Sequence, residues 1–223
     1  MFFNSQMNKL SSFFTGVKVI EEVDSPLNGR ISVIKSIGLG TYFQVGNLTQ
    51  SGGVVVDIWR MTLNRIKKIL PDPQEILILG LGGGSCAKLA RKMWPYVHIT
   101  GVDFDSTIIE LGKKYFDLGS THADIIVGDA CKFIEKTSKE KKYYGLVIVD
   151  LYVGQEFPVV FESDIFLKNL KNILAQKSIV IFNRLYYGEK RPQVVKFSHK
   201  LERYFAKVDL FYPEANVMLI CSK

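Results

Sequence analysis

The sequence predicts an α/β fold, with a doubly wound, mostly parallel seven-stranded sheet preceded by a small N-terminal antiparallel β-domain. Short strands separated by turn residues begin near Val17, and from residue 76 onward apolar runs alternate with helical patterns. The last two apolar runs are joined by Pro213–Asn216, which is too short for a parallel crossover and therefore predicts an antiparallel hairpin. We expect an N-terminal arm and β-hairpin unit over residues 1–53 and a main domain over residues 54–223.

Turn chemistry organises the N-terminal part of the chain. The stretch Ser25–Gly29 contains a proline followed by Asn-Gly, and partial alternation of apolar residues on either side favours a β-hairpin. Residues 1–16 show no clear period, and we assign them no function. The elements expected here are strands over 17–23, 30–35 and 41–47, a loop over 48–53, and a helix over 55–70 that ends at Pro71.

The main domain shows alternating strand and helix patterns. Its aliphatic runs lack polar alternation, which indicates strands buried on both faces of a parallel sheet. The expected strands span 76–80, 99–103, 124–129, 146–150, 178–183, 208–212 and 217–221. The expected helices span 86–93, 106–116, a segment through 133–134, 163–174 and 194–205. This order predicts a sheet with helices on both faces.

A glycine-rich turn follows the first strand of the main domain. Gly80, Gly82 and Gly84 precede a helix that begins near Ser85. Glycine accepts positive φ and carries no Cβ, so a ligand can approach the N–H groups of the helix N-terminus closely. About twenty residues later the next strand ends at Asp103, where a carboxylate can accept both hydroxyls of a ribose. The pair predicts nucleoside binding.

Two further aspartates follow strands of the same sheet. Asp129 ends the third strand and Asp150 the fourth, so both join Asp103 at the carboxyl edge. Ligands of open α/β sheets bind at this edge. An aspartate at a strand end is often only a helix cap, but three beside one glycine turn favour a binding site.

Composition limits the classes of partner. The net charge of +7 favours anionic partners, and RNA remains a weak possibility because the lysines and arginines are diffuse. No apolar run is long enough to cross a membrane and no signal peptide is evident, so we expect a cytoplasmic protein with no membrane partner. Cys86, Cys131 and Cys221 lack metal-ligand spacing, so we expect buried thiols and no metal.

These residues lead to a family resemblance that covers nearly the whole chain, from Val19 to Lys223. The chain resembles the polyamine aminopropyltransferases, the spermidine synthases, which place a small β-domain before a class I S-adenosylmethionine-dependent methyltransferase fold, a Rossmann-like fold. The segments that carry the resemblance are Ile76–Gly84, Val102–Asp105 with Ile108–Glu110, Gly128–Ala130, Ile148–Asp150, the closing stretch from Tyr212 to Lys223, and Gln50-Ser51 in the β-domain.

The resemblance implies a role for each matching position. Glycines 80, 82 and 84 would hold the methionine-like tail of S-adenosylmethionine or its decarboxylated form, and Asp103 would hold the ribose. Asp129 and the Ala130 backbone would bind the adenine edge, and Gln50 would cover the donor. Asp150 would act as the catalytic base that deprotonates an attacking amine, because an ammonium has no lone pair with which to attack. The resemblance also implies a homodimer.

The acceptor half departs from the family pattern. Gly83 and Val153 stand where the family has aspartates, and Val55–Arg60 replaces its Tyr-His-Glu cluster. Losing these groups should cost roughly 1.5 to 3 kcal/mol for each charge-assisted hydrogen bond to a dicationic acceptor. The sequence therefore favours binding of an S-adenosylmethionine-type donor but not of an ordinary diamine.

Three functions remain open at this point. The first is methyl transfer to a small-molecule acceptor other than an ordinary diamine. The second is a divergent aminopropyltransferase of polyamine biosynthesis, in which Asp57, Glu156 or Glu162 replaces the lost acids. The third is a non-catalytic nucleoside-binding protein. Tyr152, Gln155 and Phe157 follow Asp150 and are candidates for the acceptor pocket. Trp59 and Arg60 are either site residues or helix surface.

Overall fold

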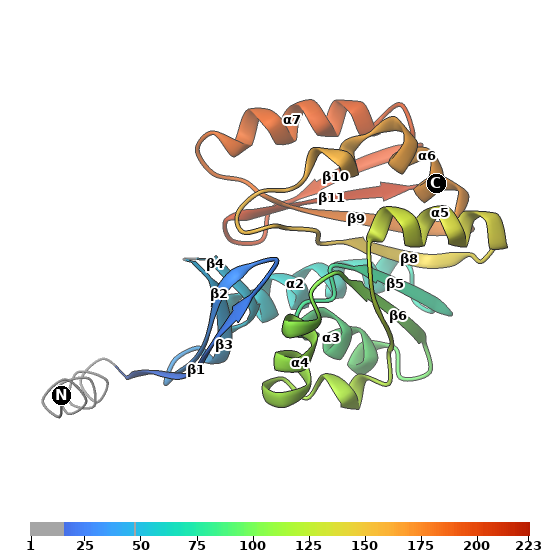
Figure 1. The fold of residues 1–223 in the computed structure, drawn as a ribbon. Coiled ribbons are helices and arrows are strands. Elements are labelled where there is room, and N and C mark those ends of the chain that lie inside the picture. Colours follow the sequence, from blue (N-terminus) through green and yellow to red (C-terminus); the bar gives the residue numbers. More distant parts are fainter. Residues whose placement is uncertain (1–15, 47) are drawn as a thin grey trace, which may run out of the picture.

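A computed structural model describes residues 16–46 and 48–223, and Figure 1 shows their arrangement. Two sheets are present in this part of the chain, one with four strands in the order β1-β2-β3-β4 and one with seven in the order β10-β11-β9-β8-β5-β6-β7. The predicted α/β fold with a mostly parallel seven-stranded sheet is confirmed. The proposed division at residues 53 and 54 stays a prediction, and most of the expected N-terminal arm lies outside the described residues.

The N-terminal sheet is an antiparallel meander. Its strands are β1 (Val17–Ser25), β2 (Gly29–Ser36), β3 (Gly40–Val45) and β4 (Leu48–Gly52). The loop predicted over 48–53 is wrong, because Leu48–Gly52 pairs with β3 in antiparallel register. Its residues are mostly polar, so the sequence lacks the alternation of a strand, but the pairing satisfies backbone groups that lie beside the main domain.

The central strands of the main sheet are parallel. They are β5 (Glu75–Leu79), β6 (His98–Asp103), β7 (Asp124–Val127), β8 (Tyr144–Val149) and β9 (Leu174–Leu185). The edge hairpin consists of β10 (Lys207–Phe211) and β11 (Asn216–Ser222), and β11 pairs antiparallel with both β10 and β9. The predicted closing hairpin is therefore confirmed.

Helices cover both faces of this sheet (Figure 1). On one face α5 (Ala130–Glu140), α6 (Asp164–Asn172) and α7 (Lys190–Leu201) pack on residues such as Leu77 and Phe182. The other face is covered by α2 (Gly53–Ile69), α3 (Ser85–Met93) and part of α4 (Ser106–Tyr115), which pack on Ile76 and Ile78. Two short 3-10 turns, η1 (Leu118–Thr121) and η2 (Val159–Glu162), complete the described chain.

Several predicted boundaries differ from the structure. Strand β9 extends to both sides of the predicted 178–183, and α7 occupies 190–201 instead of 194–205. Pro192 lies in the first turn of α7, and a proline in the sequence argues against a helix start upstream of it. The first turn of a helix tolerates proline, because the N–H groups of that turn have no intrahelical partner. The end of the predicted helix is a turn, in which Phe205 N donates to Leu201 O at 3.0 Å.

The β-domain shares a core with the main domain. Ile31, Val33 and Phe43 of the N-terminal sheet pack with Ile108 and Leu111 of α4. The Phe43 ring is fully buried and makes an edge-to-face contact with Phe116 at 5.4 Å between centroids. This packing fixes the β-domain at the carboxyl edge of the main sheet.

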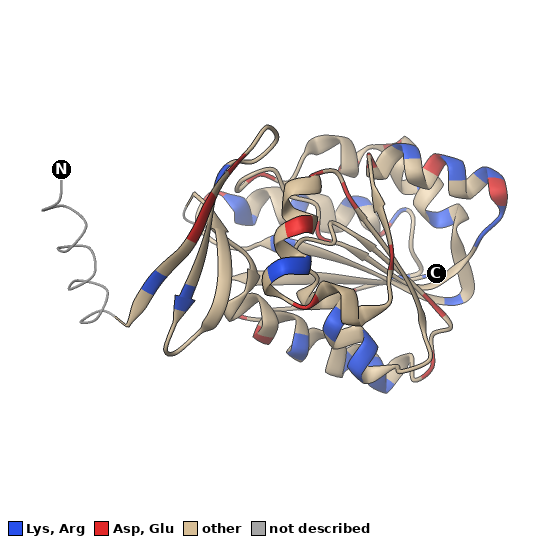
Figure 2. Cartoon of the chain, turned by 60° about the horizontal axis from the view of Figure 1, so that its bottom comes forward, with Lys and Arg blue, Asp and Glu red and all other residues tan. Residues whose placement is uncertain are grey.

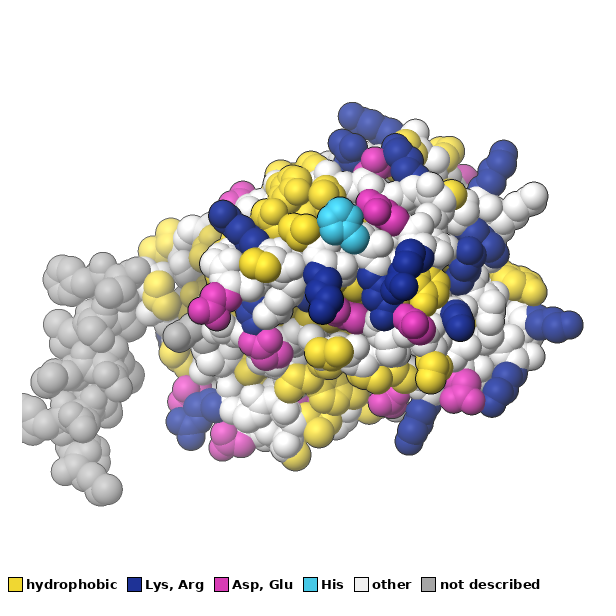
Figure 3. Space-filling view, turned by 90° about the horizontal axis from the view of Figure 1, so that it is seen from above, with side chains coloured by type: hydrophobic (Ala, Val, Ile, Leu, Met, Phe, Trp, Pro, Cys, Tyr) yellow, Lys and Arg dark blue, Asp and Glu magenta, His cyan; other side chains and the backbone are white. Residues whose placement is uncertain are grey.

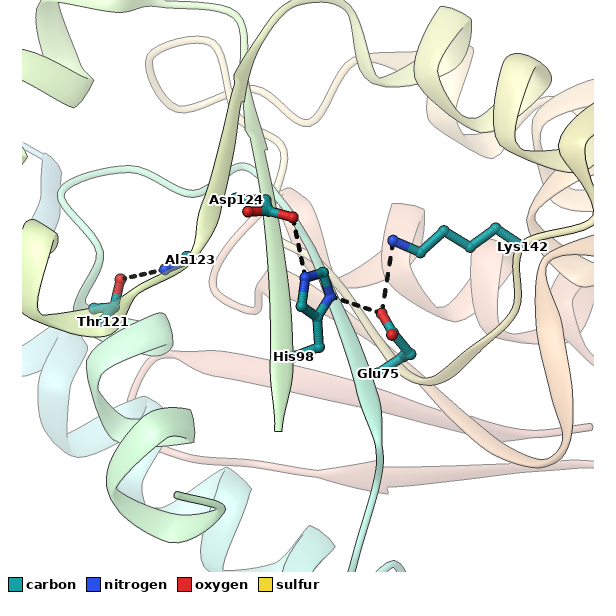
Figure 4. Close-up of polar contacts among 6 residues, drawn as sticks. All are labelled: Glu75, His98, Thr121, Ala123, Asp124 and Lys142. Carbon is teal, nitrogen blue, oxygen red and sulfur yellow. Dashed lines mark hydrogen bonds and ion pairs between the residues drawn. The ribbon is translucent and has the colours of Figure 1, made fainter. Parts of the chain in front are cut away.

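The opposite edge carries a cluster of exposed charges, shown in Figure 4. The first residues of β5, β6 and β7 are Glu75, His98 and Asp124, and the His98 ring lies between the two carboxylates at 2.9 and 3.0 Å. Lys142 Nζ lies 3.7 Å from Glu75. These groups are a third or more exposed, so solvent screening keeps their contribution to stability small.

Figure 2 shows Lys and Arg positions on several helices with Asp and Glu positions among them, and Figure 3 shows both kinds of side chain on the face that is seen from above. On α7, Lys190 pairs with Glu156 and Lys200 with Asp164. The predicted RNA partner is not tested by this distribution and stays a prediction. Within the described residues, no helix has both the length and the apolar character needed to cross a membrane.

The shared core gives a test of how the β-domain is attached. We expect Phe43→Ala to lower the free energy of unfolding by about 3–5 kcal/mol, because it empties a fully buried site between the N-terminal sheet and helix α4. Chemical denaturation followed by circular dichroism measures this. The control is Ile37→Ser, at a side chain that is 91% exposed, where we expect a change within about 0.5 kcal/mol. Equal effects of the two substitutions would contradict the packing.

Candidate active site

The glycine turn after β5 lies directly against the ends of β6 and β8. Gly80 and Leu81 donate backbone hydrogen bonds to Val102 O at 2.8 and 3.1 Å. Gly80 has φ of +85°, and a Cβ there would lie 2.0 Å from the carbonyl oxygen of Asp150. A side chain at position 80 is therefore excluded by both backbone conformation and space. The predicted cradle glycines 80, 82 and 84 all have positive φ.

Asp103 connects this turn to the second strand. Its Oδ2 accepts the Gly82 N–H at 2.8 Å, and its Oδ1 accepts the Asp105 N–H at 3.1 Å. The carboxyl is 6% exposed. Burial raises its pKa from the ordinary value, although the hydrogen bonds from Gly82 and Asp105 oppose that rise. Asp103 thus faces the glycine turn with each oxygen retaining capacity for a further donor.

An apolar cavity of about 200 Å³ lies beside Asp103. Asp129 and Ala130 line it together with Phe104, Leu151 and Phe161. This combination of apolar walls and a polar rim suits a planar heterocycle such as adenine. The Asp129 carboxylate also caps α5, accepting the Lys132 N–H at 2.9 Å through Oδ1. The structure thus places the predicted adenine-binding positions beside the predicted ribose position.

Asp150 lies at the end of β8, where the glycine turn and helix α2 meet. Its Oδ1 accepts the Asn183 side-chain N–H at 2.7 Å, and its Oδ2 accepts the Trp59 indole N–H at 3.2 Å. Burial raises the pKa of Asp150 to about 6, while these two hydrogen bonds act in the opposite direction. At neutral pH the group is therefore mainly a carboxylate that can accept a proton near physiological pH.

A second cavity, of about 260 Å³, leads from Asp150 outward. Its walls are largely apolar or neutral, with Val54, Ile58 and Leu185 among them, and its acids are Asp150 and Glu214. Gln50 lines this cavity and also the cavity beside the glycine turn. Its Nε2 donates to Gly154 O at 3.2 Å. The predicted Gln50 therefore bridges the β-domain to the loop that follows Asp150.

The acids considered as replacements for the missing carboxylates lie away from both cavities. Asp57 pairs with Arg60 and lines a separate groove. Glu156 pairs with Lys190. Glu162 pairs with the buried guanidinium of Arg184 at 2.6 Å. The same guanidinium lies over the Phe157 ring, 4.2 Å from the ring centroid. Each of these carboxylates has a cationic partner, and none of them lines either cavity.

Position 83 has no room for the family's acid. A Cβ on Gly83 would lie 2.7 Å from Phe43 Cε1 and 2.8 Å from Ser51 Oγ. Both contacts come from the β-domain, which packs against the glycine turn. Val153 occupies the second position at which the family has an aspartate, so that position carries no charge here. Its side chain is 44% exposed and lines the apolar cavity.

Two residues contact Asp150: Trp59, which the sequence left open between a site residue and helix surface, and Asn183, which sequence reasoning missed. Trp59 is 1% exposed, so the alternative of a helix surface residue is wrong for it, whereas Arg60 pairs with Asp57 at the surface. The inward spacing of Trp59 and Leu63 along α2 is the signal that could have placed the indole. Asn183 gave no such signal, because its side chain is brought to Asp150 only by the pairing of β8 with β9.

At one edge of the main sheet the structure thus brings together the glycine turn, the buried carboxylates of Asp103 and Asp150, and an apolar cavity of about 200 Å³. A family model described as "Spermine/spermidine synthase domain" matches residues 57–215. The chain belongs to this family, which confirms the predicted resemblance.

Relatives of two chemistries are similar to the chain. The polyamine aminopropyltransferase of Vibrio vulnificus is 27% identical over 114 residues, covering 51% of this chain and 38% of the relative. The eEF1A lysine and N-terminal methyltransferase homolog of Drosophila melanogaster is 25% identical over 136 residues, covering 57% of this chain and 20% of the relative. The chain thus matches less than half the length of either relative.

Solved structures with the same fold also include both chemistries. A spermidine synthase in complex with the transition state analogue AdoDATO has a TM-score of 0.74 at 18% identity, covering 92% of this chain and 74% of that one. Human methyltransferase-like protein 13 in complex with SAH has a TM-score of 0.62 at 22% identity, covering 75% of this chain and 80% of that one. At these identities the likeness establishes the fold.

The contact between the glycine turn and the β-domain can be tested at position 83. We expect Gly83→Ala to lower the free energy of unfolding by about 1–3 kcal/mol, because the new Cβ overlaps Phe43 and Ser51. The matched control is Gly119→Ala, where no atom lies within 4 Å of the new Cβ. Thermal and denaturant unfolding measure both variants. A Gly83→Ala variant as stable as the control would show that the turn is not packed in this way.

The indole of Trp59 can report the ionisation of Asp150. The chain has two tryptophans, so Trp94→Phe leaves Trp59 as the single fluorescent indole. We expect its emission to titrate with a midpoint near pH 6, because its hydrogen-bond partner gains a charge there. The control is Trp94→Phe combined with Asp150→Asn, which should remove the transition. A transition that persists in the control would assign it to another group.

Proposed function

We propose that this protein is an S-adenosylmethionine-dependent methyltransferase whose acceptor is an amine other than an ordinary diamine. The observation that carries the proposal is the environment of Asp150, a buried carboxylate held by two neutral donors at the end of a cavity in which, among the described residues, Glu214 is the only other acid. One ammonium can pair with Asp150, whereas the second charge of a diamine would meet only the exposed Glu214 among the described residues that line this cavity.

The donor half supports a tail that carries a carboxylate. The first turn of α3 contains no acidic residue, and its dipole favours an anion. Ser51 and Ser85 add hydroxyls there, with their oxygens 2.6 Å apart, and both line the cavity that contains the glycine turn. A decarboxylated donor would leave an ammonium near this positive helix end with no acid at position 83 to receive it.

In the proposed reaction the acceptor nitrogen bonds to the methyl carbon, the carbon–sulfur bond breaks, and its electron pair stays on sulfur. Asp150 binds the acceptor ammonium and accepts its proton, which frees the nitrogen lone pair for attack. Trp59 and Asn183 orient the carboxylate, and the apolar walls exclude water from it. Alignment of acceptor and methyl carbon then supplies most of the rate enhancement.

The second candidate is a divergent aminopropyltransferase. Asp150 stands at the position of the family's amine-binding acid, and several of the relatives are named polyamine aminopropyltransferases. Asp57, Glu156 and Glu162 do not line the cavity beyond Asp150, so this reading needs an acceptor that binds through a single charged end or one that also reaches the exposed Glu214. A non-catalytic nucleoside-binding protein is the third reading.

The homodimer, the cytoplasmic location and the RNA partner stay predictions.

The nucleoside product distinguishes these readings without knowledge of the acceptor. Methyl transfer releases S-adenosylhomocysteine, whereas aminopropyl transfer releases methylthioadenosine. The purified protein is supplied with either donor and a pool of amines, including putrescine and lysine-containing peptides, and the nucleosides are quantified by chromatography. We expect S-adenosylhomocysteine above the level given by the Asp150→Asn control. Methylthioadenosine formed from the decarboxylated donor would support the second reading, and no product above control would support the third.

The pH profile of the same reaction tests the role of Asp150. Because the carboxylate is the active form and the pKa is about 6, the ionised fraction rises as pH increases through that value. We expect the single-turnover rate to increase by roughly 10-fold per pH unit below pH 6 and to level above it. A rate that is flat between pH 4.5 and 7 would contradict this role.

A further inference from the structure

Asn216 lies at the start of β11, behind the amide that holds Asp150. Its Nδ2 donates to Asn183 Oδ1 at 2.7 Å, and Asn183 Nδ2 donates to Asp150 Oδ1 at 2.7 Å. The side chains of both asparagines are buried, because Asn216 is 8% exposed and Asn183 is 7% exposed. The two amides therefore form a buried chain of hydrogen bonds that ends on the carboxylate.

The pairing of β9 with β11 brings the two amides together. Its register makes Asn183 and Asn216 diagonal neighbours on adjacent antiparallel strands, so both side chains lie on the same face of the sheet. Backbone hydrogen bonds hold the turn that precedes Asn216. Asn216 N donates to Pro213 O at 3.1 Å. Tyr186 N of the chain beyond β9 donates to Ala215 O at 2.8 Å. The Asn216 side chain thus reaches Asn183 from a backbone that is held at several points.

The chain of amides has a direction, because one end of an amide donates hydrogen bonds and the other end accepts them. An ionised carboxylate only accepts, so the Asn183 nitrogen faces Asp150 and the Asn183 oxygen faces away from it. Among contacts between described residues, Asn216 supplies the one donor to this oxygen. Without that donor the buried oxygen loses its partner, and the Asn183 amide is free to turn its oxygen towards a protonated Asp150.

The titratable groups around Asp150 give its ionised form no support. They are Asp103 at the end of β6, Cys86 of α3, Tyr152 in the loop after β8, and the exposed Glu214 in the turn before β11. The Asp103 charge raises the pKa of Asp150. Burial raises the pKa values of the Cys86 thiol and the Tyr152 phenol, so both are neutral near pH 6. The carboxylate therefore depends on its hydrogen bonds from neutral donors.

We infer that Asn216 is a positioning residue for Asp150: it holds the Asn183 amide with its nitrogen towards the carboxylate and so keeps Asp150 oriented as a proton acceptor. Asn216 lines the cavity that leads outward from Asp150 but not the cavity beside the glycine turn, so its effect is on the acceptor side. The inference rests on the role of Asp150 in the proposed function, and it holds whichever group is transferred.

The test uses the emission of Trp59, which contacts Asp150, in the Trp94→Phe background. The variant is Asn216→Ala, and Asn216→Leu is a second variant that keeps the volume of the side chain without its polar atoms. The matched control is Val217→Ala, at the next residue of the same strand, where the fully buried side chain points to the other face of the sheet. Thermal unfolding shows which variants are folded.

We expect both Asn216 variants to raise the midpoint of the Trp59 titration from about pH 6 by about 0.5–1 pH unit, because losing a hydrogen bond that supports the ionised form makes the proton bind more tightly. Val217→Ala should lower stability but leave the midpoint unchanged. Asn183→Ala should raise the midpoint at least as much as Asn216→Ala. Adding Asn216→Ala to Asn183→Ala should have no further effect, because Asn216 acts through the Asn183 amide.

Two results would overturn the inference while leaving the proposed function in place. One is a midpoint that stays unchanged in the folded Asn216 variants. The other is a shift that is equally large when Asn183 is already alanine, because Asn216 would then act on Asp150 by another route. If the background protein shows no transition that Asp150→Asn removes, the inference and the proposed role of Asp150 as a base both fail.

Discussion

The Asp103 carboxylate is the interaction on which the donor site depends. It accepts one N–H from the glycine turn at Gly82 and one from Asp105, so a single buried group joins β5, β6 and the start of α4. Asp105 in turn holds the β1–β2 turn through Ser25 and Asn28. Because these groups lie in a buried, low-dielectric region, their hydrogen bonds are coupled, and a change at one position will be felt at the others.

The acceptor side follows a different physical rule. The family resemblance implies several carboxylates that pair with a dicationic acceptor. Here Asp150 instead accepts hydrogen bonds from an indole and an amide. Neutral donors orient a carboxylate without neutralising it, so its charge remains available to one cation. Burial then raises the pKa towards the range in which a base works best at physiological pH. The same neutral surroundings make a second cationic end of an acceptor costly to bury.

Local patterns predicted much of the fold and the meeting of the glycine turn with Asp103. Dense aliphatic runs define β5, β6 and β8, and Asp103 at the end of β6 accepts a hydrogen bond from the glycine turn, while nucleoside binding there stays a prediction. The sequence could not predict β4, because a polar strand is recognisable only from its partner, β3. It also could not show that a side chain at position 83 would be crowded, since the atoms that such a side chain would meet, from Phe43 and Ser51, are more than thirty residues away.

The contacts that Trp59 and Asn183 make with Asp150 escaped prediction for a related reason. Trp59 and Asn183 are far apart in the sequence and reach one carboxylate only because α2 packs beside the carboxyl ends of β8 and β9. Conversely, Asp57, Glu156 and Glu162 were reasonable replacement acids from their sequence positions, but each has a local cationic partner that the sequence did not reveal.

The most direct test of the account is a calorimetric comparison of S-adenosylmethionine with its decarboxylated form, using Asp103→Ala to show that binding occurs at this site. The helix end, its two serine hydroxyls and the absence of a side chain at Gly83 lead us to expect that the carboxylated donor binds at least about 10-fold more tightly. Tighter binding of the decarboxylated donor would contradict the account and favour aminopropyl transfer.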